Sequence, residues 1–293
     1  MSRCVVAFFA DTHGGHRLSL LNPTTKLLEQ DEEGVPHTWT PALTSPQRWL
    51  WDCYQDDIAD VWEFCGDDPL AAFHVGDPTW GAKYPEDLVD TSVYGQVMIA
   101  VANMSPWFDI PNLVAFRLEE GTNSHEFGQA TASRFISQTL RKNFPSVDVG
   151  FAAHHLEEID GCLFDIAHHG PGPGIRIWTN GNQARYYLRS AMLDEISFKQ
   201  PVPSLFVRGH VHTPIHEVVQ VPGDPTWESA IDILPPYCCM TPYARQVTRS
   251  VPRQWCGLVA WEIIDGKLGR HIAPKHMKEL RTKENLTTIM NRR

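Results

Sequence analysis

Acidic and imidazole side chains recur in this sequence directly after short apolar runs. The first pair, Asp11 and His13, follows the apolar run of residues 4–10 and precedes Gly14 and Gly15. An apolar run of this length predicts a buried strand, and the two glycines predict its end. Because alternate residues of an extended chain point the same way, Asp11 and His13 can face one metal ion. If the pair stood alone, a surface aspartate and a loop histidine would be the better explanation, because D-x-H is a short and common pattern.

Four further apolar runs end in the same residue types. They are followed, in chain order, by Asp77, by Asn123 and His125, by His168 and His169, and by His210 and His212. Ligand sites gather at the carboxyl ends of parallel strands, so we expect these side chains to meet at one edge of a sheet. Oxygen and imidazole ligands suit Mn, Fe, Zn or Ni. Two such ions roughly 3.5–4 Å apart form the known arrangement for two-metal hydrolysis.

The order of these motifs resembles that of the calcineurin-like metallophosphoesterases. That family has D-x-H, G-D, G-N-H-D/E, a histidine at a strand end and G-H-x-H, in this order. The corresponding motifs here are D-T-H at 11–13, G-D at 76–77, G-T-N-S-H-E at 121–126, A-H-H-G at 167–170 and G-H-V-H at 209–212. Each motif is short, and the ordered set carries the resemblance.

The resemblance implies a role for each matching residue. A first metal ion would be held by Asp11, His13 and His212, a second by Asn123, His168 and His210, and Asp77 would bridge the two. His125 would contact phosphate and assist the leaving group as a general acid, which makes His125 and Asp77 the expected catalytic residues. His169 and Arg208 are expected to contact the phosphate, and pairing with a surface carboxylate is the alternative for Arg208.

The implied reaction is hydrolysis of a phosphate ester, with diesters slightly ahead of monoesters. A hydroxide shared by the two ions would attack phosphorus, because metal binding lowers the pKa of water from near 16 to about 7. The expected cofactor is two divalent ions, with manganese first and iron, zinc or nickel as alternatives. A catalytically silent scaffold or binding protein of the same fold is the second hypothesis. A one-metal protein of unrelated fold would require the motif order to be coincidence.

The third motif departs from the family pattern. Thr122 follows Gly121 where the family has asparagine, and Ser124 separates Asn123 from His125. A local bulge would keep Asn123 as a ligand. Alternatively, Thr122 replaces it and the second ion is held more loosely. This altered motif is the only support for the silent scaffold.

The composition narrows the expected partners. The chain has 293 residues, 42% hydrophobic content, seven cysteines and a formal net charge of −10. An acidic protein binds nucleic acid poorly, so we expect a small phosphate ester, a nucleotide or a phosphoprotein rather than long nucleic acid. No apolar run approaches the roughly 18 residues of a membrane span. The cysteines show no CxxC pair and are interpreted as structural thiols outside the metal site, which favours a cytoplasmic location. A homo-oligomer is compatible with the sequence.

Alternating strands and helices predict an α/β protein, and the resemblance implies two mixed β-sheets packed as a sandwich with helices outside. Helices are predicted over residues 45–65, 88–105, 129–143 and 181–198. Strands are predicted over residues 4–10, 70–75, 113–118, 147–153, 162–167, 204–208, 215–221, 228–234 and 256–269, the last as a hairpin that turns at Asp265-Gly266. The strands at 147–153 and 162–167 are expected to pair across Asp160-Gly161, a hairpin signal.

One domain is expected over residues 1–270. It includes a surface excursion at about residues 16–44, which we interpret as two short extended arms around a turn at 31–34. A basic tail over residues 271–293 is expected to be a docking helix or disordered. His154 and His155 lie outside the motif set and have no expected role.

Overall fold

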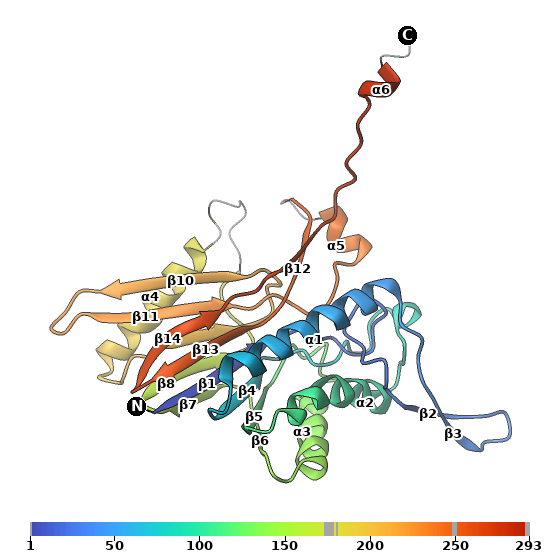
Figure 1. Cartoon of the computed structure of the whole chain (residues 1–293), viewed down its shortest axis with the longest axis horizontal. Coiled ribbons are helices and arrows are strands. Elements are labelled where there is room, and N and C mark those ends of the chain that lie inside the picture. Colours follow the sequence, from blue (N-terminus) through green and yellow to red (C-terminus); the bar gives the residue numbers. More distant parts are fainter. Residues whose placement is uncertain (1, 173–178, 180, 248–250, 291–293) are drawn as a thin grey trace.

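The computed structural model describes residues 2–172, 179, 181–247 and 251–290. Two β-sheets pack against each other, and helices cover both outer faces (Figure 1). The predicted α/β class and the sandwich of two mixed sheets are therefore confirmed.

The first sheet has six strands in the order β14-β13-β1-β4-β5-β6. Its parallel strands are β1 (Arg3–Phe9), β4 (Leu70–His74), β5 (Leu113–Glu119) and β6 (Asp148–Ala152). The antiparallel hairpin of β13 (Val259–Ile264) and β14 (Lys267–Ile272) extends it beside β1. Asp11, Asp77 and the loop at 121–126 follow β1, β4 and β5, so parallel pairing brings them to one edge.

The second sheet has five strands in the order β10-β11-β9-β8-β7. Its parallel centre consists of β8 (Cys162–Ala167), β9 (Leu205–Arg208) and β11 (Trp227–Ile233). The antiparallel edge strands are β7 (His155–Ile159) and β10 (Ile215–Val221). His168 follows β8, and His210 follows β9, again at the carboxyl ends.

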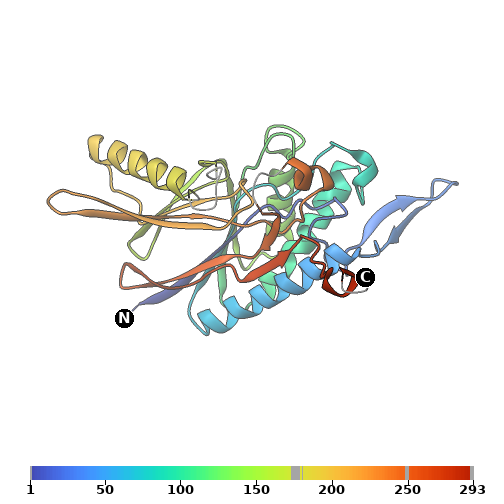
Figure 2. The same ribbon diagram turned by 90° about the horizontal axis from the view of Figure 1, so that it is seen from above.

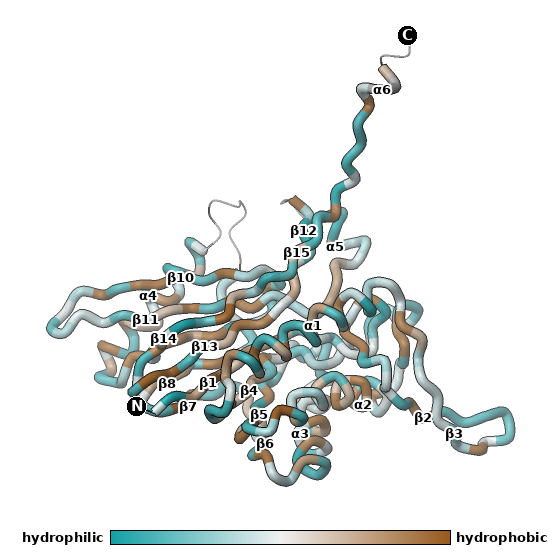
Figure 3. The backbone as a smooth tube through the Cα atoms, in the orientation of Figure 1, coloured by the Kyte–Doolittle hydropathy of each residue, from teal (hydrophilic) through white to brown (hydrophobic). Residues whose placement is uncertain are grey.

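Strand β1 is buried on both faces, which explains its continuous apolar sequence. Val5 and Phe9 belong to the core beneath the helices, whereas Val6 and Phe8 belong to the core between the sheets. The rings of Phe8 and Phe73 lie 5.1 Å apart there. Hydropathy along the backbone shows the same division, with apolar strands inside and a mostly polar tail outside (Figure 3).

Three helices cover the first sheet, and one covers the second (Figure 2). They are α1 (Ser45–Cys65), α2 (Val93–Met104) and α3 (Thr131–Asn143) on the first, and α4 (Asn182–Ser197) on the second. Thr44 and Gln47 form a capping box at the start of α1, so the predicted helix over 45–65 is confirmed. Helix α2 begins five residues later than predicted because Ser92 caps it. Two 3₁₀ turns flank α2 at η1 (Pro85–Asp87) and η2 (Ser105–Asp109).

The predicted pairing of residues 147–153 with 162–167 is wrong. Strand β6 pairs with β5 in the first sheet, and the chain then crosses to the second sheet, where β7 is the hairpin partner of β8 across Asp160-Gly161. Strand β7 was not predicted because it is an edge strand with alternate exposed positions and the polar sequence H-L-E-E-I. Such a strand lacks the apolar run that marks a buried one.

Two segments lie outside the sandwich. Strands β2 (Leu27–Gln30) and β3 (Pro36–Trp39) form a projecting hairpin, the two extended arms predicted around the turn at 31–34 (Figure 2). The rest of the predicted surface excursion is not all at the surface, because Leu20 and Leu21 are apolar and buried in the core. The tail begins as a strand rather than a helix or a disordered segment, because β15 (His276–Glu279) pairs with β12 (Arg253–Cys256). Beyond it the chain extends away from the body to α6 (Thr287–Met290), while α5 (Pro242–Val247) lies near β12 (Figure 1). No helix within the described ranges is long and apolar enough to cross a bilayer.

Candidate metal centre

Residues at the strand ends share an uncommon backbone conformation. Asp11, His13, Asp77, His210 and His212 all have positive φ, between 44° and 69°. This left-handed region is uncommon for residues other than glycine, and such strain concentrates at functional sites. This conformation recurs after β1, β4 and β9, which indicates that the backbone of each loop is held in a strained conformation that positions its side chains.

Asp11, His13 and His212 form a triangle of ligand atoms. Nε2 of His13 lies 3.6 Å from Oδ1 of Asp11 and 3.4 Å from Nε2 of His212. Nε2 of His212 lies 3.2 Å from the same Oδ1. Ligand atoms about 2.0–2.2 Å from a shared ion lie roughly 3–3.6 Å from one another. These spacings therefore suit three ligands of one ion.

A second group forms around Thr122. Its Oγ1 lies 3.3 Å from Oδ2 of Asp77, 3.4 Å from Nε2 of His168 and 3.3 Å from Nδ1 of His210. Oδ2 of Asp77 and Nε2 of His168 lie 3.1 Å from each other. The Asn123 side chain is exposed instead. Of the two alternatives for the third motif, the structure places Thr122, and not Asn123, among the candidate ligands.

Asp77 lies between the two groups. Its Oδ2 is 3.1 Å from Nε2 of His168 and 3.9 Å from Nε2 of His13. Burial raises the pKa of Asp77, but the hydrogen bond and charge of His168 outweigh burial and hold this pKa well below its usual range. Burial is likewise overcome at Asp11, where His212 and His168 lower the pKa to about 2.

The pKa of His168, the hydrogen-bond partner of Asp77, is shifted in the opposite direction. Burial lowers the pKa of His168, but its hydrogen bond to Asp77 and the charge of Asp11 raise this pKa to about 9. The buried carboxylates of Asp11 and Asp77 are thus ionised, and the positive charge of the His168 imidazolium offsets part of their negative charge. A divalent cation among these groups would replace the imidazolium proton, because histidine ligands bind metals in the neutral form.

Backbone carbonyls fix which nitrogen two of the histidines present. Nδ1 of His168 donates to the carbonyl of Val75 at 2.8 Å, and Nδ1 of His125 donates to the carbonyl of Trp80 at 2.6 Å. Nε2 of each ring therefore faces Asp77, at 3.1 and 4.0 Å from its Oδ2. Histidine ligands characteristically donate their other N–H in this way. With two carboxylates, a hydroxyl and several imidazoles at these spacings, the donor set fits two divalent ions.

Glycines allow the loops to approach this closely. A Cβ at Gly121 would lie 2.3 Å from both the backbone nitrogen and Oδ1 of Asp77. A Cβ at Gly76 would lie 2.4 Å from Nδ1 of His168, and Gly76 also has a φ of 82°. The first position of the G-D motif, Gly76, and the first position of the G-T motif, Gly121, therefore require glycine.

Glu126 stabilises the loop of the third motif, residues 121–126, through backbone hydrogen bonds. This buried carboxylate accepts hydrogen bonds from the backbone nitrogen of Gly121 at 3.0 Å and that of Ser133 at 2.8 Å. The loop is thereby closed onto the first turn of α3. Burial raises the pKa of Glu126 even though these bonds oppose the shift.

Arg208 does not reach the candidate centre. It is 1% exposed and donates to the Tyr187 hydroxyl, to the backbone and carboxylate of Asp165, and to the carbonyl of Val207. These bonds occupy all five N–H groups, so none is left for a phosphate. The alternative prediction, pairing with a carboxylate, describes its position, although the pair is buried rather than on the surface.

Three further histidines of the sequence analysis lie either beside the centre or away from it. His169 is exposed, and its ring lies 4.6 Å from that of His210, beside the second group. His154 bonds to Asp165 and His155 bonds to Glu119, and both lie outside the two groups.

Sequence reasoning missed two neighbours of the centre. Sγ of Cys238 lies 3.8 Å from Nδ1 of His212, and these two residues and His13 have ligand atoms within 4.8 Å of one another. The Trp80 ring stacks on His16 with centroids 4.0 Å apart and makes a T-shaped contact with His13 at 5.4 Å. Cys238, interpreted from the sequence as a structural thiol, thus lies beside the first ligand group. Its own sequence surroundings, Y-C-C-M, give no ligand signal.

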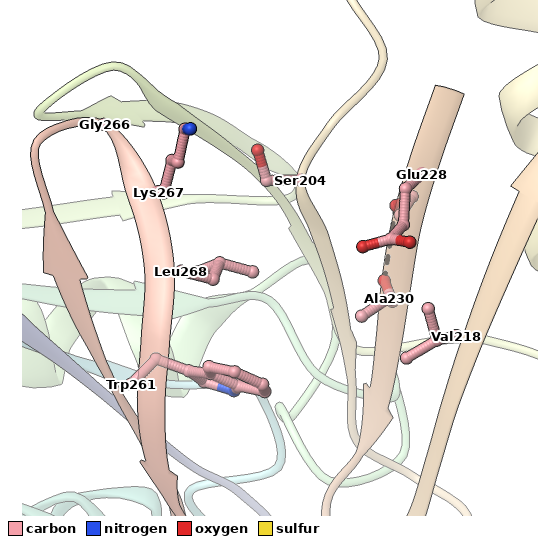
Figure 4. A pocket seen from close by; sticks show the side chains of 9 residues that line it. Ser204, Val218, Glu228, Ala230, Trp261, Gly266, Lys267 and Leu268 are labelled. Atoms are coloured by element: carbon pink, nitrogen blue, oxygen red, sulfur yellow. Dashed lines mark hydrogen bonds between the residues drawn. The ribbon is translucent and has the colours of Figure 1, made fainter. Parts of the chain in front are cut away.

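A separate cavity of about 380 Å³ lies at the other end of the second sheet (Figure 4). It is lined by Ser204, Val218, Glu228, Ser229, Ala230, Trp261, Gly266, Lys267 and Leu268. Ser204 precedes β9, whereas His210 follows that strand, so the cavity and the candidate centre occupy opposite ends.

No protein-family model and no curated protein matches this chain. One similar solved structure is a conserved uncharacterized protein of Streptococcus pneumoniae, described as a predicted phosphoesterase, at 12% identity and a TM-score of 0.34, covering 90% of this chain and 86% of that one. Another is a Thermotoga maritima protein at 11% identity and a TM-score of 0.33, covering 96% of this chain and 100% of that one. Both likenesses are too distant to assign a function, which must rest on the geometry of the centre.

Proposed function

We propose that the protein is a metal-dependent phosphoesterase with a dinuclear centre, of the calcineurin-like metallophosphoesterase type. The observation that carries this proposal is the pair of ligand groups described above, which meet at Asp77. Motif order and backbone strain support it independently, since neither depends on side-chain placement.

The first ion would be held by Asp11, His13 and His212. The second would be held by Thr122, His168 and His210, and Asp77 would serve both. Bound divalent ions would supply Lewis acidity toward phosphate oxygens and lower the pKa of water. The mixture of oxygen and nitrogen donors is compatible with manganese, our first candidate, and with iron, zinc or nickel.

His125 is the proposed proton donor to the leaving group. Its Nδ1–H is engaged with the carbonyl of Trp80, so Nε2 is the nitrogen that can exchange a proton with substrate. Nε2 lies 4.0 Å from Oδ2 of Asp77, so the proton would be delivered beside the proposed metal-binding carboxylate. The side chain is 22% exposed, which leaves it accessible to a bound ester.

The proposed substrate is a small phosphate ester, a nucleotide or a phosphoprotein, with diesters ahead of monoesters. The exposed His169 beside His210 is proposed to contact a non-bridging phosphate oxygen. The net charge of −10 disfavours long nucleic acid, which would have to approach an acidic protein.

Hydrolysis of model esters tests this function. Metal-stripped protein would be refilled with Mn, Fe, Zn or Ni and assayed with bis(p-nitrophenyl) phosphate and p-nitrophenyl phosphate. Turnover restored by metal, and lost when metal is stripped again, is expected. Absence of turnover with every metal on both esters, in protein that binds fewer than two ions, would favour the silent scaffold instead.

A further inference from the structure

His212 is contacted through both of its ring nitrogens. Nε2 faces the first ligand group, 3.2 Å from Oδ1 of Asp11 and 3.4 Å from Nε2 of His13. Nδ1, on the other side of the ring, lies 3.8 Å from Sγ of Cys238, within reach of a hydrogen bond to sulfur. The sulfur therefore occupies the position that a carbonyl oxygen occupies behind His168 and His125.

This placement has a chemical consequence for the ring. A neutral imidazole that presents the lone pair of Nε2 to a cation must carry its proton on Nδ1. That N–H needs an acceptor, and the outer partner of a histidine ligand sets both the tautomer and the ring orientation. Sulfur is a weak acceptor, so its position must be well fixed to serve this purpose.

The backbone around Cys238 supplies that fixation. The preceding residue, Tyr237, donates its N–H to the carbonyl of Asp11 at 3.2 Å, and the following residue, Cys239, donates to the carbonyl of Leu18 at 2.7 Å. Nε2 of Gln254 donates to the carbonyl of Cys238 itself at 2.8 Å. Cys238 is 5% exposed, and these backbone bonds tie it to the strand end that carries Asp11.

We propose that Cys238 is a positioning residue whose sulfur accepts the Nδ1–H of His212 and holds Nε2 toward the first metal ion. This inference rests on the proposed function, because it requires an ion at Asp11, His13 and His212. It assigns Cys238 to that ion alone and leaves the ion at Thr122, His168 and His210 unaffected.

The test compares Mn²⁺ binding to wild type, Cys238→Ala, Cys238→Ser and Cys162→Ala by electron paramagnetic resonance titration. Cys162 is the matched control, because it is also buried but packs in the core between the sheets. We expect Cys238→Ala to weaken one of two Mn²⁺ sites by about 10–100-fold. Cys238→Ser should recover part of this loss, because a hydroxyl oxygen also accepts an N–H but lies closer to its own backbone than sulfur does.

A second readout reports on the ring directly. Nitrogen-15 NMR of the zinc-loaded protein should show His212 protonated at Nδ1, with that proton exchanging faster with water in Cys238→Ala than in Cys162→Ala. Two undiminished Mn²⁺ sites together with unchanged exchange in Cys238→Ala would overturn the role of Cys238 alone. Fewer than two Mn²⁺ sites in the wild type would instead overturn the dinuclear proposal, so the two failures are distinguishable.

Discussion

Asp77 is the residue on which both ligand groups depend, and its replacement gives the first prediction. Asp77→Asn removes the negative charge while keeping the side-chain shape. We expect turnover of bis(p-nitrophenyl) phosphate to fall at least about 10³-fold, because metal-ion stabilisation supplies several kcal/mol of the barrier reduction. Steady-state kinetics of the manganese-loaded protein measure this fall. Glu228→Gln, at the distant cavity, is the control and should retain wild-type turnover.

Thr122 gives a second prediction at this scale. Its hydroxyl is a neutral ligand, and an amide oxygen at the end of a longer side chain would bind a divalent ion more firmly. Thr122→Asn should tighten the weaker Mn²⁺ site by roughly tenfold, whereas Thr122→Val, which keeps the shape without the hydroxyl, should weaken it similarly. Titration of metal-stripped protein measures both changes. Wild-type affinity at both sites in Thr122→Val would remove Thr122 from the ligand set.

Single residues also show where sequence reasoning reaches its limit. The types and order of the motifs indicated the residues that meet, because strand ends in a parallel sheet share one edge. They did not distinguish Thr122 from Asn123, since that choice depends on how residues 121–126 turn. Nor did they place Arg208, whose partners Asp165 and Tyr187 lie far away in the sequence.

At the scale of elements, the loop between β5 and α3 must approach β4 closely. Gly121→Ala would place a methyl group 2.3 Å from backbone and side-chain atoms of Asp77, so either the loop or Asp77 must shift. We expect turnover to fall at least about tenfold, since small displacements of reacting groups are costly. In Gly172→Ala, the control, no atom lies within 4 Å of the added carbon. Equal kinetics for the two variants would show that the loop is not fixed by this contact.

Strands and helices were predicted with uneven success for a physical reason. Buried strands such as β1 and β4 carry continuous apolar runs, and α1 carries a capping signal, so each is visible locally. The edge strand β7 and the tail strand β15 are half polar and acquire their structure from a partner strand. The sequence does not determine the order of the strands in a sheet, which is why β6 was predicted to pair with β8 instead of β5.

At the scale of the whole molecule, Asp57 joins distant parts of the chain. This buried residue of α1 accepts hydrogen bonds from the Tyr237 hydroxyl at 2.7 Å and from Nε2 of His276 on β15 at 3.1 Å, and Lys275 lies 3.9 Å away. Burial raises the pKa of Asp57 to about 6, although these partners oppose the shift. The folded protein therefore retains a proton that the unfolded chain releases at lower pH.

This shift predicts how stability depends on pH. Between about pH 4 and 6 the folded state binds more protons than the unfolded state, so the contribution of Asp57 to the free energy of unfolding decreases as pH rises. It should change by up to about 3 kcal/mol and level off above pH 6. Urea unfolding at pH 4 to 7 measures the free energies of unfolding of wild type and Asp57→Asn. As pH rises, the stability of the variant relative to wild type should increase. If the free energy of unfolding changed with pH in the same way for wild type and Asp57→Asn, the raised pKa of Asp57 would be contradicted.

The measurement that tests the dinuclear centre most directly is a crystal structure of the manganese-loaded protein with anomalous scattering recorded. We predict two anomalous peaks in each chain, one among Asp11, His13 and His212 and the other beside Thr122 and His168, with Asp77 between them. A single peak, or peaks away from these strand ends in fully loaded crystals, would contradict the dinuclear assignment.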